Sequence, residues 1–259
     1  MNPTALITGA SSGLGYEFAK LYAANGYNLI ITARNEEKLQ KLKDELNHIE
    51  VTIIPKDLSQ PGASKELYQH ALDKDLTISA LVNNAGFGLN GYFDELSLQE
   101  QQDMLQVNIT ALTELTHYFL PSLKKAANQG LPAGILNVAS TAAFQPGPKM
   151  AVYYASKSYV LSFSEAMAEE LKGSNVHVTT LCPGATETNF FKTAKAENSK
   201  LTSSTMSPQM VAKAGFEGYM KKQRVIVPGR VNRVSALAAK FVPRSVAARI
   251  AQNMNSANS

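Results

Sequence analysis

A glycine-rich turn between a short apolar run and a helical pattern is the feature that most constrains the fold of this chain. Residues 4–8 (TALIT) are β-prone, residues 9–15 (GASSGLG) hold three glycines, and apolar residues then recur at helical spacing from Phe18 to Tyr22. The start of a helix offers unpaired N–H groups and a partial positive charge to a phosphate. This order therefore predicts a dinucleotide-binding fold, although the spacing G-x-x-x-G-x-G differs from G-x-G-x-x-G. A purely structural turn is the alternative.

Strand-like apolar runs alternate with helical patterns along most of the chain. Strands are predicted at residues 4–8, 28–32, 51–54, 78–82, 134–139, 176–181 and 224–227. Helices are predicted after residues 15 and 35, over 61–72, 98–125, 153–171 and 208–220, and in two segments near 231–241 and after 243. Such alternation favours a parallel sheet with right-handed crossovers. We expect a single-domain α/β fold over 1–259, a Rossmann-type doubly wound parallel sheet of about seven strands with helices on both faces. Residues 186–259 would form a substrate-side lid and C-terminal extension.

Composition excludes several classes of protein. The 259 residues are 44% hydrophobic and include one cysteine, Cys182, so we expect one sizeable core and no intrachain disulfide. The four histidines are far apart in sequence, and no metal is expected. No apolar run could span a membrane and the N-terminus does not resemble a signal peptide, so we expect a cytoplasmic location. No nucleic-acid-binding signature is present, and nucleic acid is not an expected partner.

Basic residues are concentrated near the C-terminal end. After Glu217 there is no acidic residue and there are eight basic ones, so residues 218–259 carry +8, whereas the whole chain carries +4. Apolar residues recur at helical spacing from Val231 to Phe241, between arginines and lysines. A basic amphipathic segment can bind a membrane surface. We favour packing on the sheet edge or on a second subunit, with peripheral membrane contact as the alternative.

The residue after the second predicted strand bears on the cofactor. In dinucleotide-binding folds an acidic residue near this point binds the ribose hydroxyls of NAD, whereas an arginine accommodates the 2′-phosphate of NADP. Here Arg34 stands in that place. We therefore expect NADP(H) rather than NAD, with Ser11 and Asn35 assisting Arg34. An arginine that lies on the surface at a helix start is the alternative.

The stretch from Gly134 to Lys157 places three side chains with a shared chemical use. Ser140 follows a predicted strand, Tyr153 lies farther along, and Lys157 comes one helical turn after Tyr153. An ammonium near a phenol favours the phenolate, so we expect Lys157 to lower the pKa of Tyr153 and make it a usable proton donor or acceptor. Ser140 would direct a hydroxyl at the same oxygen. For Tyr-x-x-x-Lys alone, a helix-surface pair is the alternative.

Small and polar residues also follow the other predicted strands. These are Asp57 and Leu58 after the third strand, Asn83, Asn84, Ala85 and Gly86 after the fourth, and Pro183, Gly184 and Thr188 after the sixth. Because the carboxyl ends of parallel strands share one edge, we expect these residues to lie together and to bind a ligand there. Asn108, within the apolar helix predicted at 98–125, is either a structural hydrogen bonder or part of a proton relay.

In combination these motifs resemble the classical short-chain dehydrogenase/reductase family, over the chain up to about Thr188. The resemblance implies a catalytic tetrad of Asn108, Ser140, Tyr153 and Lys157, and the spacing favours Tyr153 over Tyr154. It also implies a cofactor-binding set. Its members are Gly9, Ser11, Ser12, Gly13, Leu14, Gly15, Arg34, Asp57, Leu58, Asn84, Ala85, Gly86, Tyr153, Lys157, Pro183, Gly184 and Thr188.

The reaction that this resemblance implies is hydride transfer between a nicotinamide and a carbonyl or alcohol carbon. Tyr153 would act as general acid in reduction, and Ser140 would stabilise charge on the reacting oxygen. Lys157 would also hold the nicotinamide ribose, and Asn108 would complete a water-linked proton path.

The substrate is expected to be an apolar aldehyde, ketone or 3-oxoacyl compound. The candidate lining residues are Phe87, Gln145, Met150, Phe190 and Phe191. The resemblance further implies a homodimer or homotetramer. Two other functions remain open: a non-catalytic NADP-binding regulator, and an NAD-retaining epimerase or dehydratase.

Overall fold

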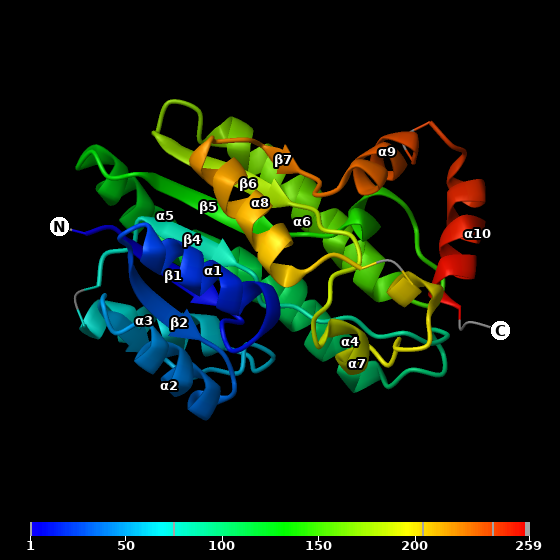
Figure 1. Cartoon of the computed structure of the whole chain (residues 1–259), viewed down its shortest axis with the longest axis horizontal. Helices are drawn as coiled ribbons and strands as arrows, with labels where there is room; N and C mark the ends of the chain where they lie inside the picture. The colour runs from blue at the N-terminus through cyan, green and yellow to red at the C-terminus, as the bar shows by residue number, and fades with distance from the viewer. Residues whose placement is uncertain (1, 75, 204, 240, 257–259) are drawn as a thin grey trace.

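A seven-stranded sheet lies at the centre of the molecule (Figure 1). The structure is a computed structural model that describes residues 2–74, 76–203, 205–239 and 241–256. The strand order is β3-β2-β1-β4-β5-β6-β7, and all neighbouring strands are parallel. The strands are β1 (Thr4–Thr8), β2 (Asn28–Thr32), β3 (Val51–Ile53), β4 (Ala80–Asn83), β5 (Ala133–Val138), β6 (Val176–Leu181) and β7 (Val225–Ile226). The predicted doubly wound sheet is confirmed, and its order reverses between β1 and β4, where such folds bind ligands.

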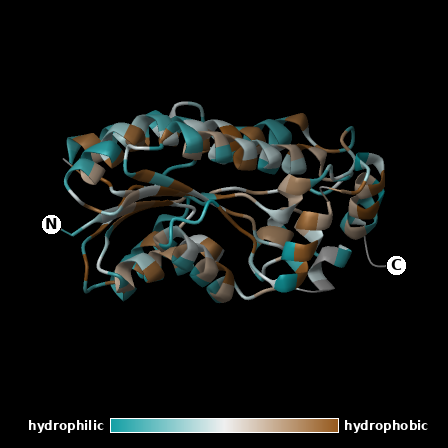
Figure 2. Cartoon of the chain, turned by 90° about the horizontal axis from the view of Figure 1, so that it is seen from above, coloured by the Kyte–Doolittle hydropathy of each residue, from teal (hydrophilic) through white to brown (hydrophobic). Residues whose placement is uncertain are grey.

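Helices cover both faces of the sheet, and Figure 2 shows one helical layer on either side of the strands. The helices of eight or more residues are α1 (Gly13–Ala24), α2 (Glu36–Glu45), α3 (Ala63–Asp73), α4 (Leu98–Leu105), α5 (Leu112–Asn128), α6 (Ala151–Glu170), α8 (Pro208–Met220), α9 (Arg230–Ala238) and α10 (Arg244–Asn255). The short helix α7 is Phe190–Thr193. Ala5 and Ile7 of β1 pack with α1, α2 and α8, whereas Leu6 packs with α3 and α5. Alternate residues of a strand thus enter the two cores.

The single helix predicted at 98–125 is wrong in one respect. A π-helical segment, Gln106–Ala111, separates α4 from α5. A π-helical turn accommodates one extra residue and commonly occurs at functional sites. Its effect here is to place the buried Asn108 toward the loop after β4, where it bonds to the backbone of Phe87. The apolar periodicity did not reveal this interruption, because both flanking helices continue in the same direction.

The C-terminal third divides between core and periphery. Helix α8 packs on α1 through buried Val211, Ala212 and Phe216, and β7 completes the sheet, so these elements are part of the main core. Helices α9 and α10 lie at the end of the molecule opposite the N-terminus (Figure 1). Lys240, part of the predicted basic segment, lies outside the described residues. None of the described helices is both long and apolar enough to cross a membrane.

Candidate active site

The carboxyl ends of the strands open into a cavity of about 520 Å³. Most of the predicted site residues line it. They are Gly9, Ser11, Ser12, Gly13, Leu14, Arg34, Asp57, Leu58, Asn84, Ala85, Gly86, Ser140, Tyr153, Lys157, Pro183, Gly184 and Thr188. Gly15 and Asn108 lie behind this lining. The structure therefore brings together residues that are up to 179 positions apart, from Gly9 to Thr188, as the parallel topology predicts.

The glycine turn after β1 is shaped by positive backbone angles and close packing. Gly9 has φ 67° and Gly13 φ 55°, conformations that favour glycine. A Cβ on Gly15 would lie 2.2 Å from the Gly9 carbonyl oxygen, and one on Gly13 would lie 3.0 Å from Thr188 Cγ2. A side chain at Gly15 would therefore clash with the turn itself, and one at Gly13 would enter the cradle in front of the first turn of α1, whose N–H groups lack helical partners. The cradle fits the pyrophosphate of a dinucleotide.

The ends of β1 and β4 are fastened to each other by Thr8 and Asn84. Thr8 Oγ1 accepts hydrogen bonds from the backbone N–H of Asn84 (3.0 Å) and of Ala85 (2.9 Å). Asn84 Nδ2 donates to the Thr8 carbonyl oxygen at 2.8 Å. The N-N-A-G segment therefore has a structural role at the point where the strand order reverses, beside its place in the cavity wall.

A basic end of the cavity lies beyond β2. Arg34 is exposed there, and no carboxylate of the described residues pairs with it. Lys38 and Lys56 line the same end. We did not predict these lysines, although Lys38 lies one helical turn after Arg34, a spacing that places both on one side of a helix start. Asn35, the expected helper, uses its side-chain oxygen to cap α2 through Lys38 N at 2.8 Å.

The acidic residue after β3 is also engaged locally. Asp57 Oδ1 accepts hydrogen bonds from the backbone N–H of Ser59 (3.0 Å) and from its hydroxyl (2.8 Å). The carboxylate is thereby held in one orientation at the cavity wall, together with Leu58.

Ser140, Tyr153 and Lys157 meet at the inner end of the cavity. The Lys157 ammonium lies 5.8 Å from the centroid of the Tyr153 ring and donates to the Val138 carbonyl oxygen at 2.9 Å. Burial raises the pKa of Tyr153 above its ordinary value, and a hydrogen bond with Ser140 acts in the opposite direction. Burial also lowers the pKa of Lys157 to about 8. The expected lowering of the Tyr153 pKa by Lys157 is not found, because loss of solvation dominates at both groups.

Asn108 connects the π-helical segment to α6, the helix that bears Tyr153 and Lys157. Its Oδ1 accepts from Phe87 N at 3.1 Å, and its Nδ2 donates to the Phe87 carbonyl oxygen (3.0 Å) and to Ser156 Oγ (3.0 Å). A Cβ on Gly86 would lie 2.9 Å from Asn108 Oδ1 and 3.3 Å from Lys157 Nζ. Because Gly86 has no side chain, the side chains of Asn108 and Lys157 can both occupy the space beside it. Asn108 therefore makes structural hydrogen bonds, and it also lies close to Lys157.

Four predicted substrate-side residues, all apolar, lie in the remaining wall of the cavity. Phe87, Met150, Phe190 and Phe191 line it, whereas Gln145 does not. The Phe190 ring lies 5.2 Å from the Tyr153 ring. A second, apolar cavity of about 200 Å³ adjoins the first, and Met150 lines both. Gln145, which we predicted to line the cavity, follows the turn at residues 141–144 and lies outside the lining.

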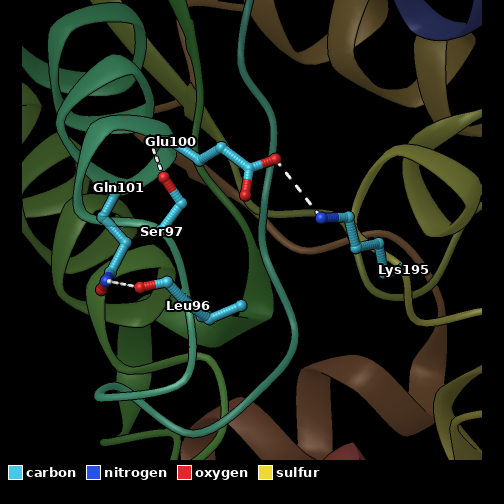
Figure 3. A network of polar contacts seen from close by, with 5 residues as sticks. All are labelled: Leu96, Ser97, Glu100, Gln101 and Lys195. Carbon is cyan, nitrogen blue, oxygen red and sulfur yellow. Dashed lines mark hydrogen bonds and ion pairs between the residues drawn. The ribbon is translucent and has the colours of Figure 1, made fainter.

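The segment that bears Phe190 is held over the cavity from the side of α4. The backbone N–H of Asn90 donates to the Ala194 carbonyl oxygen at 2.8 Å. Figure 3 shows the Lys195 ammonium reaching toward Glu100 of α4, with 3.3 Å between Nζ and Oε1. Ser97 caps that helix and Gln101 bonds to the Leu96 carbonyl oxygen, which fixes the base of this contact (Figure 3). The ion pair is exposed and adds little, about 0–1 kcal/mol, so packing of Phe191 and the buried Ala194 is the main tether.

Asn255, at the end of α10, lies outside the cavity lining but contacts Tyr154 within it, which the sequence did not reveal. The Tyr154 hydroxyl donates to Asn255 Oδ1 at 3.1 Å, and Asn255 Nδ2 donates to the Pro148 carbonyl oxygen at 2.9 Å. Asn90 Nδ2 donates to the Asn255 carbonyl oxygen at 2.9 Å. Tyr154 is therefore tied to the C-terminal helix, and Tyr153 is the phenol that faces Ser140. No local sequence signal marks a contact between residues so far apart.

Comparison with known proteins settles the family. The sequence model described as short chain dehydrogenase matches residues 3–199. The chain belongs to the short-chain dehydrogenase family. Sulfoacetaldehyde reductase 2 of Chromohalobacter salexigens is 35% identical over 192 residues, which are 73% of this chain and 75% of that protein. This short-chain dehydrogenase is thus an oxidoreductase that acts on an alcohol or carbonyl group.

Two solved structures resemble this short-chain dehydrogenase over nearly its whole length. A short-chain dehydrogenase from Sphingobium yanoikuyae in complex with NADPH has a TM-score of 0.81 and 29% identity, and covers 92% of this chain and 93% of its own. One from Burkholderia phymatum in complex with NAD has a TM-score of 0.81 and 25% identity, and covers 100% and 98%. Members of the same fold thus bind either cofactor.

Proposed function

We propose that this short-chain dehydrogenase is an NADP(H)-dependent reductase of apolar aldehydes, ketones or 3-oxoacyl compounds. One observation carries the proposal. A single cavity has Ser140, Tyr153 and Lys157 at its inner end and Arg34 with Lys38 at its outer end. The inner end has the groups that proton transfer to a carbonyl oxygen needs, and the outer end has the positive charge that a 2′-phosphate needs.

The residues around the cavity fit an NADP molecule. The turn from Gly9 to Leu14 would hold the pyrophosphate at the start of α1. Arg34 and Lys38 would bind the 2′-phosphate, and Asp57 with Leu58 would flank the adenine. The Asn84–Gly86 segment and the Pro183–Thr188 segment would enclose the nicotinamide half, as the family resemblance implies. When bound, the cofactor supplies or accepts a hydride.

Side chains of the protein would supply the proton that the substrate oxygen needs in reduction. Because burial raises the pKa of Tyr153, the phenol is protonated at neutral pH and is ready to donate to a carbonyl oxygen. Ser140 would donate a hydrogen bond to the same oxygen. Lys157 would hold the nicotinamide ribose and, with Asn108 nearby, pass protons to Tyr153 from solvent.

The apolar wall supports the substrate class. Phe87, Met150, Phe190 and Phe191 line the cavity together with Tyr153, and Asp103 adds one carboxylate to the same lining. Burial of a charged substrate group against these residues would be costly. The second cavity behind Met150 would give room to an alkyl or acyl extension. We also expect a homodimer or homotetramer.

The test is oxidation of NADPH and of NADH by the purified protein with aldehydes, ketones and 3-oxoacyl thioesters. Turnover with NADPH that is lost in Tyr153→Phe is the expected result. Faster turnover with NADH than with NADPH would contradict the assignment of the cofactor but not the proposed hydride-transfer reaction. Tight NADPH binding without turnover on any substrate would favour a regulatory protein. Co-purification of tightly held NAD would favour an epimerase or dehydratase.

A further inference from the structure

Helix α9 turns its apolar side chains away from the protein. Its buried residue is Ala236, and the half-buried Asn232 lies on the same side. Val231 (78% exposed), Val234 (68%) and Leu237 (58%) lie on the opposite side, and Phe241, just after the helix, is 81% exposed. Packing on the sheet edge, one of the two arrangements that we favoured from sequence, would have buried these residues in the single chain, whereas packing on a second subunit, the other, would not. The periodicity was correct, but the direction of the apolar face is the reverse.

Helix α10 continues this pattern. Ala247, Ala251 and Asn255 recur every fourth residue and are buried against the protein. Val246, Ile250 and Met254 form an adjacent stripe and are 41–51% exposed. Figure 1 shows α9 and α10 together at one end of the molecule. We call the exposed apolar residues of α9, Phe241 and α10 the C-terminal surface.

Arginines accompany the apolar residues of this surface. Arg230 and Arg233 belong to α9, Arg244 and Arg249 belong to α10, and all four are exposed. Within the part of the chain that the structure describes, none of the four pairs with a carboxylate. No acidic residue follows Glu217 in the sequence, so α9 and α10 themselves carry positive charges and no negative ones.

We propose that the C-terminal surface binds an anionic lipid bilayer, with its apolar side chains in the acyl boundary and its arginines on the lipid phosphates. Exposed apolar residues flanked by arginine are the pattern of helices that lie in the membrane interface. Arginine pairs well with phosphate, and each basic residue near an anionic membrane contributes to binding. Symmetric pairing with a second copy would bring two positively charged surfaces together, which the charge distribution disfavours.

The surface adjoins the active-site cavity. The side chain of Asn232 in α9 packs on Gly184, since a Cβ there would lie 2.5 Å from Asn232 Nδ2, and Gly184 lines the cavity. At the end of α10, Asn255 bonds to Tyr154. A bilayer on this surface would lie beside the apolar, substrate-binding end of the enzyme. This orientation rests on the proposed function, but lipid binding itself does not.

The first test is co-sedimentation with phosphatidylcholine vesicles, with and without phosphatidylglycerol. We expect binding to the anionic vesicles, and Arg230→Gln with Arg233→Gln should lower the partition constant roughly 30-fold, the change that corresponds to about 1 kcal/mol per arginine. Val234→Ser with Leu237→Ser should also weaken binding. Lys124→Gln with Lys125→Gln on α5, and Leu98→Ser on α4, are the matched controls and should bind like the unaltered protein. Equal sedimentation with neutral and anionic vesicles would overturn the proposal.

The second test uses the absence of tryptophan from the sequence. Phe241→Trp provides a single fluorophore at the surface, and Leu98→Trp provides a control at a similarly exposed site. We expect anionic vesicles to shift the Phe241→Trp emission to the blue, and brominated lipids to quench it, with no change in the control. An unshifted emission would overturn the proposal. Sedimentation equilibrium offers a further outcome against the proposal. If it shows an oligomer that Val234→Ser with Leu237→Ser dissociates, a second copy of the chain covers the C-terminal surface instead of a bilayer. Activity enters neither test, so failure of the proposed function leaves both interpretable.

Discussion

Two opposing effects act on the pKa of the Tyr153 phenol. Removal from water raises its pKa, and the Ser140 hydrogen bond lowers it by less. Lys157, expected to be the main partner, bonds instead to the Val138 carbonyl oxygen. In the structure Ser140 hydrogen-bonds to the phenol, whereas Lys157 lies 5.8 Å from the centroid of its ring.

Tyr153→Phe is expected to lower kcat about 10²- to 10⁴-fold, the range for loss of a general acid, and to leave NADPH affinity and thermal stability nearly unchanged. Steady-state kinetics, NADPH titration and thermal unfolding measure the three quantities. Tyr154→Phe is the matched control, because it removes the neighbouring phenol and should retain turnover. Near-normal kcat in Tyr153→Phe would remove Tyr153 from the reaction.

Arg34→Ser combined with Lys38→Ser is expected to raise KM for NADPH roughly 10- to 100-fold, because hydrogen bonds to a charged group contribute about 1.5–3 kcal/mol. KM for NADH should stay the same, since NADH has no 2′-phosphate. Lys41→Ser, on the same helix but outside the cavity lining, is the control. An equal rise for both cofactors would show that the basic end does not recognise the 2′-phosphate.

At the scale of elements, the sequence predicted what depends on short-range pattern. Strand positions follow from apolar runs, and their assembly at one edge follows from parallel topology, so the cavity lining from Gly9 to Thr188 was largely predictable. The π-helical segment at Asn108 was not, because one extra residue in a turn leaves the apolar pattern intact. The Asn255 contacts were not either, since they join side chains about a hundred residues apart.

The anchoring of α10 gives an element-scale prediction. Asn255→Ala leaves the Tyr154 hydroxyl and the Pro148 carbonyl without these partners in a buried place, and we expect a loss of roughly 2 kcal/mol in the free energy of unfolding. Because Met150 follows Pro148 into the cavity wall, KM for an apolar substrate should rise while KM for NADPH does not. Gln252→Ala on the exposed side of α10 is the control. Unchanged substrate KM in a destabilised variant would limit Asn255 to a structural role.

The β5–β6 pair predicts a dependence of stability on pH. The His177 ring lies on Gly134 of β5 and 4.4 Å from the Tyr219 ring of α8. Burial lowers the pKa of His177 to about 4, so between pH 4 and 6.5 the unfolded chain binds a proton that the folded protein does not. Stability should therefore fall by roughly 2–3 kcal/mol as pH decreases through this window. Urea unfolding at a series of pH values measures it, and His177→Gln should flatten the slope.

At the scale of the whole molecule, the two ends of the cavity have different surroundings. The outer end, at Arg34 and Lys38, opens toward α2, where a charged cofactor can enter from water. The inner, apolar end lies next to α9 and α10. The positive charge of α9 and α10 could be predicted from the sequence. The direction of their apolar faces could not, since periodicity alone does not say which side of a helix faces the core. Only the packing of Ala236 and Ala247 against the protein decides that.

The contact of Asn232 with Gly184 places the C-terminal surface next to the cavity wall. An enzyme bound to a bilayer through this surface would encounter an apolar substrate by diffusion within the plane of the membrane. Its rate would then follow the mole fraction of substrate in the bilayer rather than its concentration in water. Dilution of the substrate with inert lipid would slow the reaction even when the total amount of substrate stayed constant.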